Sequence, residues 1–518
     1  MNGYNRLIAF GVFFLSLAVF SLARSRYVSL AATGTAQALL LAGDEPAYLM
    51  LTHSLVTDGD FNLYNNCLNR DGRYFGREQS GGHAARKDRE KEEVYSIHTP
   101  GLAILLAPAY AMGLNGPIAP RPAVCLFLNL LGALLAVNVY WYCIAIIGDR
   151  GLDSVACPEL LPALACTAAV VLTPPVIFYS NLAYPELPGA LFILYALRHS
   201  MLRSTSGRTG EPANRRNDVF GALKSPTRPF ADSPIRRLSV SPSHLLSSLA
   251  AAFLPWLSFR FFTPAVIIIW LLSRRGRSIP GGHRCDRLFP YAALAVSMVL
   301  LLSYQYRAFG TIHPAGGYAA QDWAQRGFFN RGIVNGLLGI ILDQGHGIFA
   351  WSPVYILSLT GLLLLVRDRR DQGVWLMIVL LSLYLPGASF VHWWGGFAPP
   401  PRFMVVSAPL LGGALCYALA RIPRRSFSVL FGLLLCVSLY FGYMGCMHPS
   451  KLYRHEHIIT IYHPRLMGRI FPSFMHHRRS TWPLTLLWGS AIALLNGYYL
   501  RGHNRRKSGA AAPGLRHQ

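Results

Sequence analysis

The chain has 518 residues, of which 53% are hydrophobic and only 14% are charged, and its formal net charge at pH 7 is +25. In a soluble protein this charge would indicate a nucleic-acid partner, but here the basic residues gather in loops between long apolar runs. The composition therefore favours an integral membrane protein, and we expect no nucleic-acid partner.

The apolar runs are each close to the roughly 20 residues that a helix needs to cross about 30 Å of hydrocarbon. They do not alternate as the strands of a membrane barrel would, so the sequence predicts an all-α, polytopic fold. In chain order they cover residues 6–24, 121–147, 159–180, 288–303, 349–366, 373–390, 403–420, 426–447 and 483–500.

Basic loops set the orientation of these runs, because loops rich in Arg and Lys stay in the cytoplasm. One further run, residues 244–272, lies between two such loops and must cross twice, as two short helices broken between Pro255 and Pro264. The result is about 12 transmembrane helices with both termini inside. The basic loops are residues 198–237, which form most of a cytoplasmic insertion at 199–243, then 274–287, 367–370, 421–425 and the tail from 501.

The first external loop, residues 25–120, carries two adjacent acids in the stretch LLAGDEPAYL. Asp44 and Glu45 precede Pro46, which suits the first turn of a helix, where the helix dipole favours a carboxylate. A capping role explains such an acid, but ionisable groups at membrane depth are costly and usually mark a site. Residues 99–113 are apolar but short, and their two prolines indicate a helix embedded in the interface.

Further polar residues fall on the outer side in this topology. Glu186 lies at a helix start, where capping is again an alternative, and Arg260 lies at the break between two short helices. A guanidinium there can bind a phosphate or simply extend its charge to the interface. The polar segment 69–93 is expected to be a mobile surface loop. The remaining candidates are His98 in YSIHTPG, Asp343 in GIILDQGHGIFAWSP, and His392 and Arg402 in VHWWGGFAPPPRF.

The nine cysteines contain no CxxC pair, and most lie inside predicted helices. They therefore indicate neither a metal site nor a disulfide framework. One external bridge, between Cys67 and Cys446, is compatible with the topology, but nothing in the sequence favours it.

A series of motifs occurs in a recognisable order: GDEPAYL, SIHTPGLAILLAPAY, FYSNLAYPELPGAL, LPWLSFRF, LDQGHGIFAWSPVY and HWWGGFAPPPRF. Together they resemble a bacterial branch of the GT-C-type integral-membrane glycosyltransferases, a superfamily that includes the protein O-mannosyltransferases and the lipid A aminoarabinose transferases. The resemblance covers most of residues 1–405, which we expect to form the catalytic module. Residues 406–518, with the last helices and a basic cytoplasmic tail, carry none of it.

The resemblance implies a glycosyltransferase of the plasma (inner) membrane with its active site on the external, periplasmic face. Such enzymes move a sugar, usually with inversion, from a polyprenyl-phosphate carrier to a glycan, lipid or protein acceptor. By motif position Asp44 would be the catalytic base and Glu45 its alternate. Arg260 and Arg402 would hold the carrier phosphate, since a guanidinium matches phosphate oxygens bidentately. Contacts to the sugar or acceptor would come from His98, Glu186, Asp343 and His392.

Two matters stay open at this point. Some members of the superfamily use a divalent cation and others do not, so the sequence requires no cofactor and leaves a cation open.

The alternative function is a transporter or lipid flippase, which predicts broken helices in matching halves, whereas one broken pair, at 255–264, is seen. A third interpretation, an assembly protein without catalysis, would be favoured by loss of the two acids, and both are present.

Overall fold

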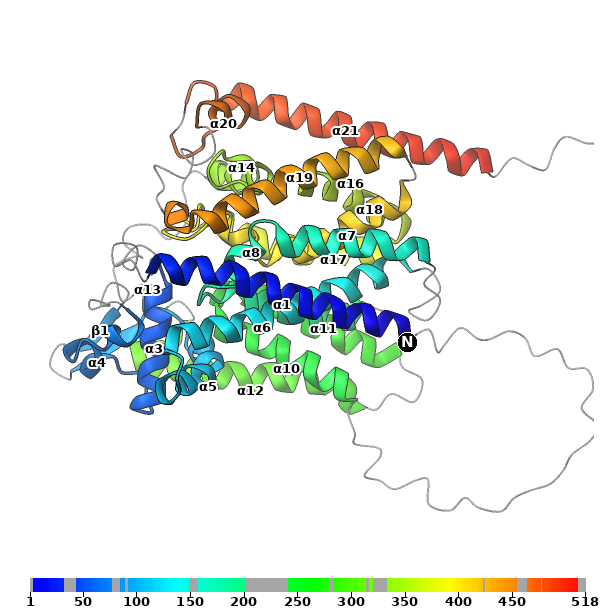
Figure 1. Ribbon diagram of the computed structural model, residues 1–518. Coiled ribbons are helices and arrows are strands. Elements are labelled where there is room, and N and C mark those ends of the chain that lie inside the picture. Colours follow the sequence, from blue (N-terminus) through cyan, green and yellow to red (C-terminus); the bar gives the residue numbers. More distant parts are fainter. Residues whose placement is uncertain are drawn as a thin grey trace, which may run out of the picture.

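The computed structural model describes residues 3–31, 43–76, 84–88, 92–148, 157–201, 241–278, 284–313, 316–319, 333–422, 424–453, 464–476 and 478–510. Within these ranges the chain is almost entirely helical, and the long helices lie side by side in one bundle (Figure 1). Short helices and a two-stranded hairpin form a cap at one end of the bundle. The predicted helical class is confirmed.

Each predicted apolar run falls on a helix of the bundle. The long helices are α1 (Gly3–Ala31), α6 (Pro120–Ile147), α7 (Cys157–Leu172), α9 (Glu186–Met201), α10 (Pro242–Leu257), α11 (Phe262–Ser278), α12 (Arg284–Phe309), α14 (Ile333–Leu342), α16 (Ile356–Asp368), α17 (Arg370–Ser389), α18 (Ser407–Arg421), α19 (Arg425–Met447) and α21 (Thr481–Ala510). The short elements between them are α8 (Val176–Tyr179), η6 (Phe259–Phe261), α13 (Gly316–Ala319), α15 (Ile348–Trp351), η7 (Pro353–Tyr355), η8 (Arg402–Met404), η9 (Pro449–Tyr453) and α20 (Pro464–Ile470).

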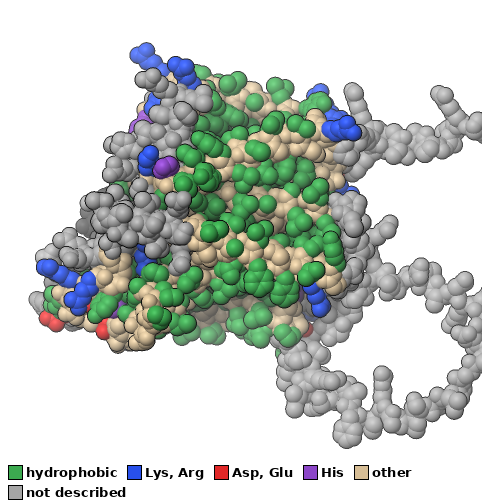
Figure 2. Space-filling model, in the orientation of Figure 1, with side chains coloured by type: hydrophobic (Ala, Val, Ile, Leu, Met, Phe, Trp, Pro, Cys, Tyr) green, Lys and Arg blue, Asp and Glu red, His purple; other side chains and the backbone are tan. Residues whose placement is uncertain are grey.

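Among the described residues, 5 helices are long and apolar enough to cross a membrane: α1, α6, α12, α17 and α19. Large hydrophobic side chains are exposed along them, such as Phe14 on α1, Val299 on α12 and Leu433 on α19. Figure 2 shows hydrophobic side chains over the side of the bundle and charged side chains towards its two ends. Burial in lipid explains these exposed apolar sides, and the protein is a multi-pass membrane protein. The predicted count of about 12 spans is not confirmed.

Helix α6 organises the bundle, where it packs against α1, α7, α9 and α18. Its side chains Leu135, Val139 and Tyr140 are fully buried. Elsewhere small residues let helices approach closely: a side chain at Gly361 in α16 would overlap the backbone carbonyl of Ala414 in α18. Such small-residue packing is a usual means of helix association in lipid, where burial of apolar surface adds little driving force.

The segment between two basic loops forms two helices with a break, as the sequence predicts. Helix α10 ends at Leu257, Ser258 is extended with φ −163° and ψ 138°, and η6 then leads into α11. Pro264 lies in the first turn of α11, where its missing N–H costs no helical hydrogen bond. The break places Arg260 at the same end of the bundle as the cap.

The cap contains the loop predicted to be the first external one and lies at the other end of the bundle from the start of α1 (Figure 1). Its helix α3 (Glu45–Thr57) runs across the ends of the long helices and packs against α5 (Gly101–Asn115), which is the predicted short apolar helix. Pro46 lies in the first turn of α3, as expected. The other elements are α4 (Tyr64–Leu68), η1 (Asp71–Phe75), and the antiparallel strands β1 (Ala84–Asp88) and β2 (Glu93–Ser96).

Two predicted loops lie partly outside the described residues. The polar segment 69–93 is described only at 69–76, 84–88 and 92–93, and the insertion 199–243 only at its two ends. Neither Cys67 nor Cys446 is in a disulfide, so the bridge considered between them is not formed.

Replacement of Gly361 by valine tests the close approach of α16 and α18. Because the new side chain meets the Ala414 carbonyl, we expect overpacking to lower the free energy of unfolding by roughly 1–3 kcal/mol. Thermal unfolding in detergent measures the change. Gly432→Val in α19 is the matched control, since nothing lies within 4 Å of a side chain there. Equal losses in the two variants would contradict the prediction.

Candidate functional site

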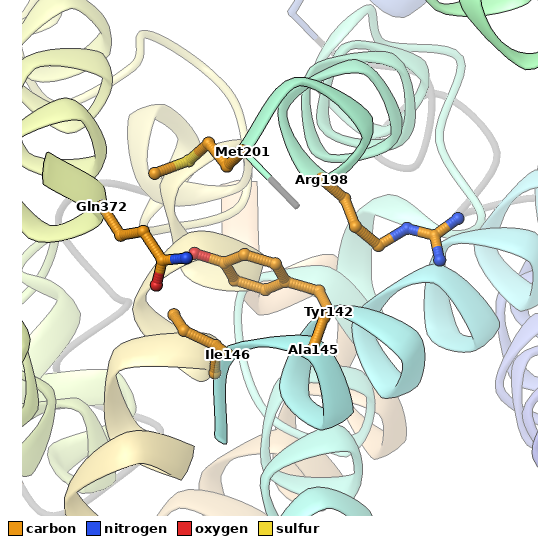
Figure 3. A pocket seen from close by; sticks show the side chains of 6 residues that line it. All are labelled: Tyr142, Ala145, Ile146, Arg198, Met201 and Gln372. Carbon is orange, nitrogen blue, oxygen red and sulfur yellow. The ribbon is translucent and has the colours of Figure 1, made fainter. Parts of the chain in front are cut away.

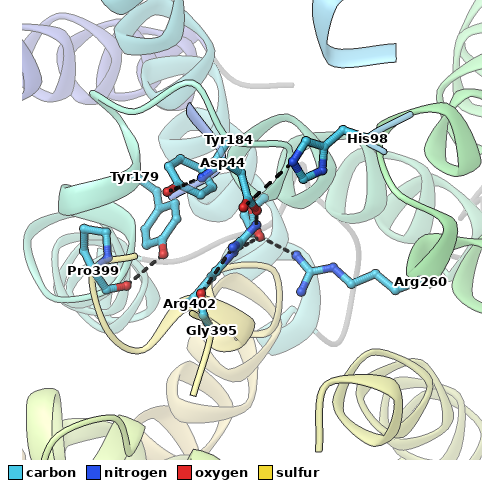
Figure 4. A network of polar contacts seen from close by, with 9 residues as sticks. Asp44, His98, Tyr179, Tyr184, Arg260, Gly395, Pro399 and Arg402 are labelled. Carbon is cyan, nitrogen blue, oxygen red and sulfur yellow. Dashed lines mark hydrogen bonds and ion pairs between the residues drawn. The ribbon is translucent and has the colours of Figure 1, made fainter. Parts of the chain in front are cut away.

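Charged side chains from distant segments converge at the cap end of the bundle (Figure 4). Asp44 directly precedes α3, His98 precedes α5, Glu186 opens α9, Arg260 lies in η6 and Arg402 opens η8. These five residues are termed the acid–arginine network. All five residues lie at or just before a helix start, or at a helix break. At such points the backbone leaves the helical hydrogen-bonding pattern, so side chains from several helices can meet.

Glu186 is the centre of the network. Its Oε1 accepts hydrogen bonds from Nη2 of Arg260 at 2.6 Å and from Nε of Arg402 at 2.7 Å. The side chain of Glu186 is fully buried, and those of the two arginines are 15% and 12% exposed. Cationic partners are needed because a buried, unpaired carboxylate is strongly destabilising. The second oxygen, Oε2, is buried and has no hydrogen-bond partner among the described residues.

Arg402 joins the two acids of the network. Its Nη2 donates to Oδ2 of Asp44 at 2.5 Å and its Nη1 donates to the carbonyl oxygen of Gly395 at 3.2 Å, so each of its nitrogens has a partner. The guanidinium also lies over the ring of Tyr184, 4.7 Å from its centroid. Burial lowers the pKa of Arg402, but Asp44 and Glu186 more than offset this and hold that pKa well above its usual value. Arg402 is therefore a fixed cation.

Asp44 occupies the position before α3, yet its side chain makes no capping hydrogen bond to that helix. The carboxylate faces Arg402 instead, and its Oδ1 lies 3.9 Å from Nε2 of His98, whose ring stacks on Tyr48 with centroids 4.6 Å apart. The hydroxyl of Tyr184 accepts the backbone N–H of Asp44 at 3.3 Å. The side chain of Asp44 is 16% exposed. A capping role therefore does not explain this acid.

Glu45 turns away from the network and into the bundle. Its carboxylate is fully buried and accepts hydrogen bonds of 3.3 Å from both Nε and Nη2 of Arg121, in the first turn of α6. The backbone N–H of Ala183 donates to Oε1 at 3.4 Å. These contacts tie the start of α3 to α6 and to the segment before α9. Glu45 thus fixes the backbone that carries Asp44.

Arg260 is less fully engaged than Arg402. Its Nη2 is bonded to Glu186, and its guanidinium lies 4.9 Å from the ring centroids of both Phe261 and Phe403. Its Nε and Nη1 make no hydrogen bond within the part of the chain that the structure describes. Burial lowers the pKa of Arg260, and Glu186 partly restores it. These two donors make Arg260 the cation of the network best able to receive an anion.

Asp343 lies in a separate polar turn. Its Oδ1 accepts the backbone N–H groups of Gly345 and His346, at 2.8 and 3.1 Å, and its Oδ2 accepts that of Phe474 at 2.8 Å. Both carboxylate oxygens are thus used to brace the turn before α15 and to hold it against the segment that follows α20. The structure does not bring Asp343 into the acid–arginine network.

His392 lies in the loop between α17 and η8, the same loop that ends at Arg402. Its ring stands edge-on to those of Phe390 and Trp394, with centroids 5.7 and 4.9 Å away, and burial lowers its pKa. Gly395 in this loop has φ +97°, a backbone conformation that glycine adopts without strain, and it presents its carbonyl to Arg402. The loop therefore positions Arg402, and His392 belongs to its aromatic part.

Sequence reasoning missed Tyr184 and Arg121, which the structure places against the two adjacent acids. Arg121 opens a long apolar helix, and a cation at such a position signals a buried partner. Tyr184 belongs to a motif already singled out for Glu186. No pattern of spacing predicts that its hydroxyl meets Asp44, which is 140 residues away in the chain.

The residues of the network do not fit a divalent cation. Asp44 and Glu186 both face guanidinium groups, whereas Mg²⁺ and Ca²⁺ need several oxygen ligands around one point. Among the described residues, no group of three or more His, Cys, Asp or Glu side chains is arranged to hold a metal. No step proposed below passes through a metal ion.

Comparisons with known proteins find similar solved structures. No family model matches the sequence, and no curated protein matches it. The chain is similar to the oligosaccharyltransferase of Archaeoglobus fulgidus in its apo form, with a TM-score of 0.46 and 13% identity over 84% of this chain. An archaeal oligosaccharyltransferase from that organism, in complex with an inhibitory peptide and a dolichol-phosphate, gives 0.44 and 10% over 84%. A complex with Zn and sulfate gives 0.43 and 13% over 85%.

These matches cover 56%, 56% and 53% of the solved chains, so the present chain spans little more than half of their length. The similar structures are oligosaccharyltransferases. The function proposed below rests on the contacts of this chain's own residues.

Removal of the charge of Glu186 tests whether this acid holds the network together. Glu186→Gln leaves two buried guanidinium groups with half of their compensating charge, so we expect the free energy of unfolding to fall by roughly 3–5 kcal/mol. Thermal unfolding in detergent measures the loss. Glu92→Gln, at an exposed acid of the cap, is the matched control. An unchanged unfolding temperature for Glu186→Gln would show that the arginines do not depend on this acid.

Proposed function

We propose that the protein transfers a sugar from a polyprenyl-phosphate carrier to an acceptor at the external face of the membrane, with inversion and with Asp44 as general base. The observation that carries this proposal is the acid–arginine network at one end of a membrane-spanning bundle. A donor anchored in lipid and an acceptor from the aqueous side can both reach such a position, and charged side chains buried in an apolar bundle usually mark a site.

Arg260 is the proposed ligand of the carrier phosphate. Its Nε and Nη1 carry N–H groups that are not bonded to Glu186, and each can donate a hydrogen bond to a phosphate oxygen. Arg402, assigned to the phosphate jointly with Arg260 from the sequence, already bonds both acids and is proposed to orient them. Arg260 has one acidic partner whereas Arg402 bonds both acids, so a phosphate can bind to Arg260 while Asp44 stays paired with Arg402.

Asp44 is the proposed base of a single displacement. The acceptor hydroxyl gives its proton to a carboxylate oxygen of Asp44 while its own oxygen bonds to the anomeric carbon, on the face opposite the phosphate. The bond from that carbon to the phosphate oxygen breaks, and its electron pair leaves with the carrier phosphate, whose charge Arg260 stabilises. One displacement without a covalent enzyme intermediate inverts the anomeric centre.

Glu186 and His98 are proposed to contact the sugar. The buried Oε2 of Glu186 lacks a partner among the described residues, and a sugar hydroxyl would satisfy it. The ring of His98 is held by Tyr48 on one face, with Nε2 near Asp44. His392 is proposed as an acceptor contact because its loop carries Arg402. Asp343 is left out, since its oxygens already accept three backbone N–H groups.

The position of the network favours this enzyme over a transporter. Transporters bind their substrate near the middle of the bilayer, between repeats related by symmetry. Here the charged residues lie at one end of the bundle, where α3, α9 and η8 begin.

Asp44→Asn keeps the size of the side chain and removes the base. In membranes with matched protein levels, we expect transfer from a radiolabelled polyprenyl-phosphate sugar pool to fall by roughly 10²–10⁴-fold. Asp371→Asn, at an exposed acid that opens α17, is the matched control and should transfer as the wild type does. Equal transfer by both variants would remove Asp44 as the base. Absence of transfer by the wild type, across several carrier-linked sugars, would favour the transporter.

Arg260→Gln tests the phosphate assignment. Loss of a charged hydrogen-bond donor should raise KM for the carrier-linked donor by about tenfold or more, because such bonds contribute about 1.5–3 kcal/mol. Initial rates at increasing donor concentration give KM, and the unfolding temperature shows whether the variant is folded. Arg73→Gln, at an exposed arginine of the cap, is the matched control. If KM is the same in the two variants, the phosphate is bound elsewhere.

A further inference from the structure

A group of cations without matching acids lies between α19 and α21. Beyond Asp371 the chain holds a single acid, Glu456, whereas residues 448–479 alone contain six Arg or Lys residues. The exposed cations among the described residues of this segment are Lys451, Arg469, Arg478 and Arg479. None of the four forms an ion pair within the part of the chain that the structure describes. One acid cannot neutralise so many cations, so this segment favours an anionic partner.

The segment lies at the end of the bundle where a basic loop is least expected. Figure 1 places α20 at the same end as the cap, opposite the start of α1, and Figure 2 shows Lys and Arg side chains at that end. The sequence predicts this end to be external, whereas the positive-inside rule keeps short loops rich in Arg and Lys in the cytoplasm. Orientation in the membrane therefore does not explain these cations, and a bound partner does.

Contacts to the bundle fix the backbone that carries the cations. Phe474 is 2% exposed, and its backbone N–H donates to Oδ2 of Asp343 at 2.8 Å. The indole N–H of Trp488 in α21 donates to the carbonyl oxygen of Ile470 at 2.8 Å, and the indole stacks on Phe471 with ring centroids 4.7 Å apart. Phe471 and Phe474 are thus buried, while the charged side chains of the same segment are exposed.

Three of these cations come together where α20 approaches the start of α21. A side chain built at Gly468 in α20 would lie 2.7 Å from Nη1 of Arg478, so the guanidinium of Arg478 lies against α20, beside the position that precedes Arg469. Arg479 follows directly in the chain. Arg469, Arg478 and Arg479 are termed the basic edge. Guanidinium N–H groups are well suited to phosphate oxygens.

Exposed hydrophobic side chains adjoin the basic edge. Ile470 follows Arg469, Trp482 lies in the first turn of α21, and Leu486 lies one turn further on. All three are exposed, although they are large and apolar, and lipid around the bundle explains their exposure. Cations and a tryptophan at the end of an apolar helix are typical of the depth at which lipid headgroups lie.

We propose that the basic edge binds the headgroups of anionic phospholipids in the leaflet at the cap end of the bundle. Phosphate oxygens accept hydrogen bonds from the guanidinium groups, and the first carbons of the acyl chains contact Ile470 and Trp482. A soluble acidic protein or a nucleic acid would match the charge but would leave these two apolar side chains without a partner. Charge and apolar surface together therefore select a lipid.

Arg198, at the other end of the bundle, has different surroundings. Its guanidinium lies 6.0 Å from the centroid of the Tyr195 ring, on its own helix. It points away from Tyr142 and Gln372, with which Arg198 lines a small pocket (Figure 3). Arg198 is only partly exposed, whereas the three arginines of the basic edge are open to the surface. Exposure beside apolar side chains is what makes the basic edge accessible to a headgroup.

This inference does not rest on the proposed glycosyl transfer, because no residue of the basic edge belongs to the acid–arginine network. The lipid is bound to the protein and not consumed. Failure of either proposal therefore leaves the other intact.

Native mass spectrometry of the purified full-length chain, released from detergent with added lipid, tests the proposal. The probes are phosphatidylglycerol, which is anionic, phosphatidylcholine with the same acyl chains, which has no net charge, and inorganic phosphate. We expect retained phosphatidylglycerol with about tenfold or higher affinity than phosphatidylcholine. Equal retention of the two lipids, or displacement of phosphatidylglycerol by millimolar inorganic phosphate, would overturn the proposal.

A double variant ties the retention to the basic edge. Arg478→Gln with Arg479→Gln removes two charges, and we expect it to weaken retention of phosphatidylglycerol roughly 30-fold, at about 1 kcal/mol for each charge, with an unchanged unfolding temperature. Arg70→Gln with Arg73→Gln is the matched control, since it removes two exposed arginines from the cap, at the same end of the bundle, and should bind as the wild type does.

Wild-type retention in the double variant of the basic edge, or an equal loss in the control, would show that phosphatidylglycerol does not bind there. If the double variant does not fold, Arg469→Gln decides alone. Its expected loss is about fivefold, because one charge is removed.

Discussion

One carboxylate oxygen, Oε1 of Glu186, accepts hydrogen bonds from two guanidinium groups in a nearly dry site, and the arrangement of the cap end depends on it. Two cations beside one buried anion leave an excess positive charge, so a second acid is required nearby. Asp44 meets that need through Arg402. Charge balance therefore explains why the starts of α3, α9 and η8 and the break at η6 must meet at one point.

The two adjacent acids, Asp44 and Glu45, lie in different surroundings and have different partners. Asp44 faces the partly exposed network, whereas Glu45 is fully buried against Arg121. The buried ion pair of Glu45 and Arg121 must lose its hydration and therefore adds little net stability. It does fix the direction in which the chain leaves the bundle. The contacts of Glu45 hold the start of α3 in place, and the general base proposed at Asp44 requires such a fixed backbone.

Sequence patterns within a few residues predict the helix starts, breaks and apolar helices, because these depend on short-range interactions. Pro46 marks the first turn of α3, the prolines near residue 258 mark the break between α10 and α11, and apolar runs mark the long helices. The motifs also single out Asp44, Glu186, Arg260 and Arg402. Their pairing was not predictable, because it joins segments from 74 to 358 residues apart, and contacts at such distances depend on how the helices pack.

The separation of Asp44 from Arg402 by 358 residues has a consequence for how the protein is made. Chains are synthesised from the N-terminus, so Asp44 and Glu186 reach the membrane before either of their arginines exists. Neither acid has an arginine partner from the network until η6 and η8 have been made. The ion pairs of Arg402 with Glu186 and Asp44 are therefore the last of the network that can form.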